Sequence, residues 1–225
     1  MKTFLCALLL VLANLACARI YRPVEVLATP ARIQAGIQAG DLAGHVVPQP
    51  WGDNSRYEDR AREAGLHVLV LSLENRSLEA LDILGLERPE GATLLTPEAA
   101  LGLVRQRPAR YLIYPLIPAG LMGLAFSNTA SSLADPAFWL FLATVDLVFG
   151  LPNAWVAAGS DARLGAFFRE QAFHPGTLPV GGVQRELVFL RRFDLRPPPS
   201  LRVRYRSAAG EQRLDLVCSK PSDAP

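Results

Sequence analysis

YLIYPLIPAGLMGLAF, residues 111–126, opens the stretch that decides the fold. The stretch continues through SNTASSLADP (127–136) to FWLFLATVDLVFGLPNAWVAAGS (138–160), and its only charged side chains are Asp135 and Asp146. The surface of a soluble domain is normally rich in charged residues. The rest of the chain must therefore either bury this stretch or present it to a membrane.

The breaks in this stretch predict a pair of short helices. Asp135 followed by Pro136 is a strong helix start, and Gly150 followed by Pro152 is a strong stop. A helix of about fourteen residues reaches roughly 21 Å, which is less than the roughly 30 Å of hydrocarbon in a bilayer. The sequence therefore predicts an apolar helical hairpin within an insertion at 111–174.

Two further features argue against a pair of membrane spans. The first arm, 111–126, is interrupted at Pro115 and Pro118. An unpaired Asp146 carboxylate in lipid would cost about 2.5 kcal/mol or more. A two-span accessory subunit of the inner membrane stays open as an alternative, because NAWVAAG (153–159) can extend the second arm beyond Pro152 with a kink.

Large aromatic side chains on the second arm form a candidate contact surface. They are Phe138, Trp139, Phe141 and Phe149. Aromatic residues around a whole helix are not typical of ordinary exposed surface. We expect part of the hairpin to pack on the rest of the protein and part to contact membrane lipid or an envelope protein.

The first 18 residues have the order of a secretory signal. Lys2 precedes an apolar core from Phe4 to Leu12, and small residues follow at 16–18. The apolar core is too short to span a bilayer. The sequence therefore predicts export to the periplasmic side of a bacterial envelope.

Two kinds of signal cleavage fit the same residues. Ala16-Cys17-Ala18 satisfies the small-x-small rule, which would release a chain beginning at Arg19. Leu15-Ala16-Cys17 resembles the end of a lipoprotein signal, in which the cysteine is lipidated, although Asn14 stands where such motifs usually have Leu. Cys17 is therefore the candidate lipid anchor. Cys6 lies in the part that is removed, and Cys17 is either removed or lipidated. Cys218 is then the one free thiol expected in the exported chain, so no internal disulfide can form.

The remaining sequence predicts mostly antiparallel sheet, in two halves at 19–110 and 175–218. Alternation predicts strands at 44–47, 66–74, 186–193, 201–206 and 212–218, with a second strand in 78–91 paired to the 66–74 strand across the turn ENRS (74–77). Capping residues predict short helices from Asn54 or Ser55 to Gly65, from Thr96 to before Pro108, and from Ser160 to the HPG at 174–176. We expect the tail at 219–225 to be disordered.

The ENRS turn, the Gly-containing apolar insertion and the later strand PGTLPVGGVQRELVFL (175–190) with its closing hairpin resemble uncharacterised bacterial envelope lipoproteins. The resemblance implies an immunoglobulin-like β-sandwich and an envelope location, and it carries over no catalytic residue. The predicted class is thus α+β, an antiparallel immunoglobulin-like sandwich with an inserted apolar helical hairpin.

Composition and motifs point away from catalysis. The net charge of +2 is nearly balanced, so no basic surface for nucleic acid is expected. His45, His67 and His174 have no metal-ligand spacing, and no phosphate loop or nucleophile elbow is present. We expect no cofactor and no metal, infer no small-molecule ligand, and predict a non-catalytic, lipid-anchored binding or scaffolding protein. A periplasmic enzyme using Asp53, His67 or Glu58 is the lesser alternative.

Overall fold

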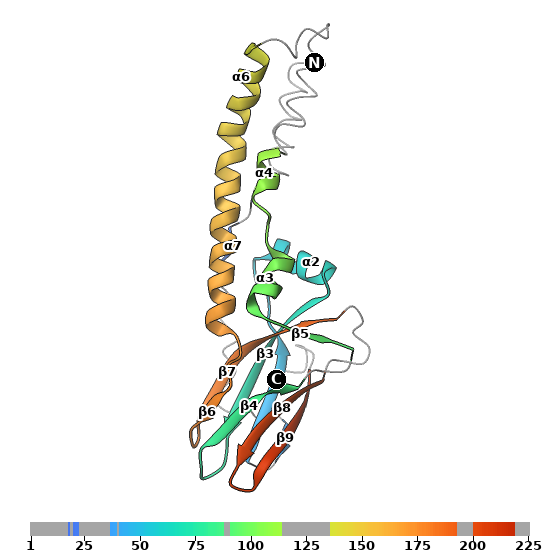
Figure 1. The fold of residues 1–225 in the computed structure, drawn as a ribbon, viewed down its shortest axis with the longest axis vertical. Helices are drawn as coiled ribbons and strands as arrows, with labels where there is room; N and C mark the ends of the chain where they lie inside the picture. Colours follow the sequence, from blue (N-terminus) through green and yellow to red (C-terminus); the bar gives the residue numbers. More distant parts are fainter. Residues whose placement is uncertain are drawn as a thin grey trace. The chain divides into compact units, whose positions relative to one another are not determined.

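The computed structural model describes residues 18, 20–22, 37–39, 41–87, 91–113, 136–192 and 200–218. The chain is α+β, with two antiparallel sheets and a few helices (Figure 1). It divides into two compact units. Among the described residues, the first unit contains 18, 20–22, 105–113 and 136–163, and the second contains the others. Both sheets belong to the second unit.

The first sheet has five strands in the order β1-β2-β3-β7-β5. The strands are β1 (Ile37–Ala39), β2 (Leu42–Pro48), β3 (Leu66–Asn75), β7 (Val183–Arg191) and β5 (Thr93–Leu95). Strand β3 lies at the centre, between β2 and β7, and most of its side chains are buried whichever face they occupy. The apolar residues on both faces of this strand are explained by its central position.

The second sheet has four strands in the order β6-β4-β8-β9. They are β6 (Gly176–Leu178), β4 (Leu81–Glu87), β8 (Ser200–Ser207) and β9 (Gly210–Val217). The predicted closing hairpin is confirmed as β8 and β9, which pair directly from Ser207 opposite Gly210. Gly210 has a φ of 107°, a backbone conformation that favours glycine over residues with a Cβ.

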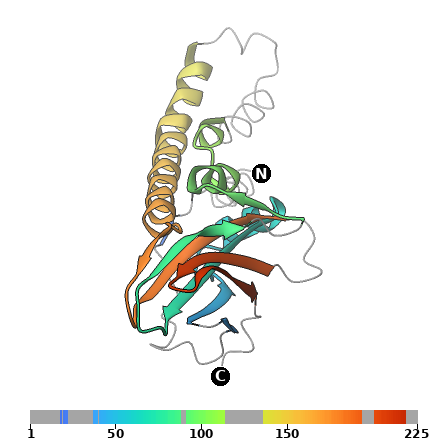
Figure 2. The same ribbon diagram turned by 60° about the horizontal axis from the view of Figure 1, so that its bottom comes forward.

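The two sheets enclose one hydrophobic core, and Figure 2 shows them as separate layers. Leu201, Val203 and Tyr205 of β8 point into this core, as their alternation with arginines predicts. Each fully buried aliphatic side chain contributes roughly 1.5–3 kcal/mol of transfer free energy. The other members come from strands β2, β3, β4, β6, β7 and β9: Leu42, Val46, Leu69, Leu71, Leu73, Leu81, Ile83, Leu178, Val188, Leu190, Leu214 and Leu216.

One predicted strand pairing is wrong. The segment after the ENRS turn does form a strand, β4, but β4 pairs with β6 and β8 in the second sheet and not with β3. The side chain of Asn75 explains the difference, because it bonds backbone carbonyls at Glu79, Leu178 and Pro179. The turn therefore carries the chain from one sheet to the other, and Leu81 and Ile83 face the shared core.

Two short helices of the second unit follow the capping signals. Helix α2 (Ser55–Glu63) begins after Asn54, and Gly65 follows it with a φ of 64°. Helix α3 (Pro97–Val104) begins after Thr96, whose hydroxyl accepts a hydrogen bond from the Ala99 N–H at 3.3 Å. Both helices are confirmed at the predicted places, although the Asn54 side chain makes no cap hydrogen bond to α2.

The helical segments of the first unit depart from the prediction. They are α4 (Ala109–Ile113), α6 (Pro136–Val145), the π-helical segment η2 (Asp146–Gly150) and the first part of α7 (Leu151–Gln171). The helix start at Pro136 is confirmed. The stop at Gly150 is wrong, since helical structure continues directly into α7, and Ser160 lies inside α7 rather than capping a new helix.

Proline chemistry explains why the helix continues. Pro152 has no N–H, and in regular α-geometry its ring clashes with the carbonyl four residues before it. The π-helical turn immediately before Pro152 changes the local hydrogen-bond spacing and gives the ring room. In the described part of the chain, no helix is both long enough and apolar enough to cross a membrane.

Several predictions concern residues outside those described. The signal segment up to Cys17, most of the hairpin's first arm and the tail at 219–225 are among them. The arm is described only at its beginning, where Tyr111 to Ile113 belong to α4.

Candidate functional site

Ala18 and Tyr21, near the beginning of the chain, contact helix α7. The backbone N–H of Ala18 donates to Asn153 Oδ1 at 2.9 Å, and the N–H of Tyr21 donates to Ser160 Oγ at 3.1 Å. Asn153 and Ser160 are seven residues apart, so they occupy the same face of the helix two turns from each other. This face of α7 receives the N-terminal segment.

The contact between this segment and α7 is close. Ala157, one turn from each of the two acceptors, has no exposed surface, and Tyr21 is almost completely buried. The small side chain of Ala157 lets another part of the chain approach the helix. A burial of this kind orders the segment at Tyr21 instead of leaving it as an extended tether.

A second set of polar contacts holds α4 on the same unit. Both carboxylate oxygens of Asp161 accept hydrogen bonds from the Gln106 N–H, at 3.0 and 2.9 Å. The side-chain oxygen of Gln106 in turn accepts a hydrogen bond from the buried Tyr111 hydroxyl at 2.8 Å. Helix α4 lies beside η2 in this arrangement (Figure 1). Polar groups on α7 thus fix two separate segments of the chain.

The other surface of the helical segments is apolar and exposed. We call this surface the apolar stripe and define it by the large hydrophobic residues Trp139, Leu140, Leu147, Val148, Leu151 and Trp155. Trp155 is 81% exposed and Leu140 is 70% exposed, which is unusual for side chains of this size. Large exposed apolar side chains gathered on one helical segment are typical of surfaces at which proteins contact a ligand, a lipid or another protein.

The apolar stripe overlaps only in part with the residues that the sequence singled out. Trp139 belongs to it and is 56% exposed. Phe138 and Phe141 lie on the backbone of α6 and Phe149 on that of η2, but their side chains are outside the described part of the structure. Cys17, the candidate lipid anchor, also lies outside it, directly before Ala18 in sequence.

Sequence reasoning missed five members of the stripe. Leu140, Leu147 and Val148 were missed because only aromatic side chains of the second arm were selected. Leu151 and Trp155 were missed because the expected helix stop at Gly150 separates them from the earlier residues. A search for apolar residues three or four positions apart, carried through Pro152, would have found Leu147, Leu151 and Trp155 together.

The histidines of the described chain do not form a metal site, and no group of three potential ligands gathers among the described residues. The His67 ring Nε2 lies 3.1 Å from the Arg192 carbonyl oxygen. Burial lowers the pKa of His45. The backbone N–H of His174 donates to the Glu186 carboxylate at 2.8 Å. Each histidine therefore lies in its own local environment.

The second unit forms a pocket at the ENRS turn, and the residues of the enzyme alternative, Asp53, His67 and Glu58, do not line it. That pocket has a volume of about 520 Å³ and is lined by Glu74, Asn75, Arg76, Ser77, Val180 and Gly181. Glu58 instead pairs with Arg62 on the surface of α2 at 3.2 Å. The pocket is a shallow polar depression where the ENRS turn (74–77) meets the turn PVGG (179–182).

These two turns are joined by backbone hydrogen bonds as well as by the Asn75 side chain. The Asn75 N–H donates to the Gly182 carbonyl, and the Gly181 N–H donates to the Asn75 carbonyl. The motifs that carry the family resemblance, ENRS and PGTLPVGG, are thus in direct contact although about a hundred residues separate them. Their role in the structure is to tie the two sheets together.

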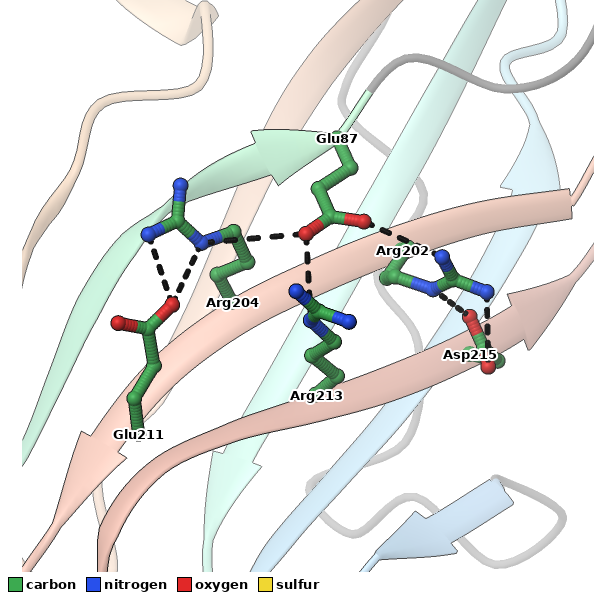
Figure 3. A network of polar contacts seen from close by, with 6 residues as sticks. All are labelled: Glu87, Arg202, Arg204, Glu211, Arg213 and Asp215. Carbon is green, nitrogen blue, oxygen red and sulfur yellow. Dashed lines mark hydrogen bonds and ion pairs between the residues drawn. The ribbon is translucent and has the colours of Figure 1, made fainter.

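An ion-pair network covers the outer face of the second sheet (Figure 3). Glu87 lies within 4 Å of Arg202, Arg204 and Arg213. Arg202 also pairs with Asp215 at 2.6 Å, and Arg204 pairs with Glu211 at 2.7 Å. Three arginines meet three carboxylates, so the network offers no excess charge to a nucleic acid or a phosphate.

No protein family, curated protein or solved structure matches this chain. The site is therefore defined by its own geometry: an N-terminal segment held on one face of α7, and an apolar stripe along the exposed surface of the same helical unit.

Proposed function

We propose that this protein is exported to the bacterial cell envelope, is anchored on the periplasmic side by lipid on Cys17, and acts there by binding or scaffolding rather than by catalysis. The observation that carries the proposal is the docking of Ala18 and Tyr21 on α7. Cleavage before Cys17 keeps both of these residues in the mature protein. Cleavage after Ala18 removes one of the two hydrogen bonds.

The proposal includes the type of fold. The two antiparallel sheets form an immunoglobulin-like sandwich, and the helical unit is an apolar hairpin inserted into it. The shared core of the two sheets supports a sandwich. The meeting of the ENRS and PVGG turns supports the family resemblance, and the position of α4 beside η2 supports a hairpin.

A binding role agrees with the chemistry of the described surface. The exposed feature that stands out is the apolar stripe, whereas the charged groups of the second sheet neutralise one another. A lipid anchor restricts such a protein to the membrane surface, where a partner or the bilayer itself is available to the stripe.

Metabolic labelling with a radioactive or clickable fatty acid tests the anchor. We expect label on the wild-type protein and none on Cys17→Ala, and we expect the mature N-terminus found by mass spectrometry to be an acylated Cys17. Cys218→Ala is the matched control and should keep the label. A mature N-terminus at Arg19, without label, would overturn the proposal.

A further inference from the structure

Three exposed arginines lie close together at the beginning of α4. We call them the arginine patch: Arg105, Arg107 and Arg110. The first two lie between α3 and α4, and Arg110 belongs to α4. The N–H of Arg110 donates to the Arg107 carbonyl at 3.0 Å, which closes a turn. Residues three apart in such a turn have Cα atoms within about 7 Å of each other, so the long side chains of the patch can reach one ligand.

Gln106 fixes the backbone of the patch. It is 1% exposed, and its N–H donates to both carboxylate oxygens of Asp161 at 3.0 and 2.9 Å. Its Oε1 accepts a hydrogen bond from the Tyr111 hydroxyl at 2.8 Å. The turn is thus held on α7 by one contact and on α4 by the other. Because this backbone is ordered before a ligand arrives, binding loses less conformational entropy.

Arg107 has a backbone conformation that is unusual for its residue type. Its φ is 54°, and among the described residues it is the one non-glycine residue with a positive φ. Glycine adopts this conformation more easily. Strained backbone of this kind is concentrated at binding sites, where the geometry serves the function. A guanidinium group that binds a ligand gives a reason for arginine at a position that suits glycine.

The positive charge of the patch is not neutralised. Among the residues that the structure describes, the three arginine side chains form no hydrogen bond and no ion pair. Asp161, the acidic residue that contacts this turn, directs both oxygens to the Gln106 N–H. The second sheet differs, since Arg202, Arg204 and Arg213 pair with carboxylates. The patch is therefore a local excess of positive charge.

A phosphate group is the ligand that matches several guanidinium groups at once. Each guanidinium presents a planar fork of N–H donors that fits two oxygen atoms of an anion. A carboxylate has two oxygens, so one fork can occupy it fully. A phosphomonoester has three terminal oxygens that are all strong acceptors, so it can bond more than one arginine. Three arginines on one short turn therefore favour phosphate over a single carboxylate.

We propose that the arginine patch binds a phosphate anion, either inorganic phosphate or the phosphomonoester group of a larger ligand. The phosphate accepts hydrogen bonds from the guanidinium groups of Arg105, Arg107 and Arg110, and the turn held by Gln106 sets their positions. The proposal does not depend on lipid at Cys17, because it uses described residues of the first unit alone.

Phosphorus-31 NMR of inorganic phosphate, titrated with the full-length protein at constant ionic strength, measures the affinity. We expect saturable binding by the wild type. Arg105→Gln with Arg110→Gln should weaken it about tenfold or more, because hydrogen bonds to charged groups contribute on this scale. Arg204→Gln with Arg213→Gln is the matched control: it removes two arginines that are already paired with carboxylates, so the affinity should not change.

Arg107→Gly separates binding from folding. Glycine relieves the backbone strain, so denaturant unfolding should show no loss of stability. The affinity for phosphate should nevertheless fall about tenfold, because one guanidinium group is lost. A folded Arg107→Gly variant that binds phosphate as tightly as the wild type would refute the proposal.

Vesicles distinguish the two sources of the phosphate group. The protein is sedimented with phosphatidylcholine vesicles that contain or lack phosphatidic acid, whose headgroup is a phosphomonoester. Binding that rises with phosphatidic acid, and loses this rise in Arg105→Gln with Arg110→Gln, supports the lipid source. Saturable binding of inorganic phosphate alone supports the free ion. Absence of both overturns the proposal, and binding of polyglutamate in their place would assign the patch to an acidic peptide.

Discussion

Asn75→Asp is predicted to destabilise the second unit strongly, although the two side chains have nearly the same shape. The side chain of Asn75 is 1% exposed. Its Nδ2 donates to the carbonyl oxygens of Glu79, Leu178 and Pro179 at 2.8, 3.0 and 3.1 Å. An aspartate removes these donors and places a carboxylate oxygen against three carbonyl oxygens.

The magnitude follows from the lost hydrogen bonds and the buried charge. Each buried group left without a partner costs about 1–3 kcal/mol, and an unpaired charge costs more, so we expect a loss of about 3–5 kcal/mol in the free energy of unfolding at neutral pH. The carbonyl oxygens favour the protonated acid and would raise the folded-state pKa of the new carboxyl group. The folded variant then binds more protons than the unfolded variant, so its deficit should shrink as the pH falls.

Denaturant unfolding followed by the circular dichroism of the sheets measures this effect. Ser77→Ala is the control, since it removes the hydroxyl that donates to Asn75 Oδ1 at 2.7 Å but keeps the Asn75 donors, and we expect about 1 kcal/mol or less. A loss below about 1 kcal/mol for Asn75→Asp, or a deficit that does not change with pH, would show that Asn75 does not hold the two turns together.

Three further predictions concern the second unit. Gly44→Ala places a Cβ at 2.8 Å from Leu214 Cδ2 and 2.9 Å from the Leu216 methyl groups, so overpacking should lower the free energy of unfolding, measured with denaturant, by about 1–3 kcal/mol. Gly102→Ala in α3 is the control, because its Cβ meets no atom within 4 Å, and it should be neutral or stabilising. Burial lowers the pKa of His45, so the unfolded chain binds more protons and the free energy of unfolding should fall as the pH drops below about 6.5. This part of the pH dependence should disappear in His45→Gln. An unchanged pH profile in the variant would show that His45 is not its source. Burial raises the pKa of the Cys218 thiol, so alkylation at neutral pH should be slower in the folded protein than in denaturant, and equal rates would refute burial of the thiol.

Local signals in the sequence were sufficient for several individual elements, of which β8 and α3 are examples. Alternation of Leu201, Val203 and Tyr205 with arginines was enough to place β8 and its inner face, because a strand turns successive side chains to opposite sides. Thr96 and Pro97 were enough to place the start of α3, because an N-cap acts within one turn of its own helix. These features depend on neighbours in sequence.

Long-range contacts decided what the sequence left open. The partner of β4 was chosen by Asn75, whose buried side chain bonds residues about a hundred positions away, and the turn alone does not reveal this. The helix also continues past Gly150 through a π-helical segment, although the local rule predicts a stop.

The candidate site shows the same division. Its ingredients, an N-terminal stretch with the residue order expected of a signal and an apolar stretch from 111 to 160, are properties of the sequence by itself. Only the tertiary structure placed Ala18 and Tyr21 on Asn153 and Ser160 and left Leu151 and Trp155 exposed. The physical reason is that composition determines how much apolar surface the chain has. The packing of segments distant in sequence determines which part of that apolar surface is buried.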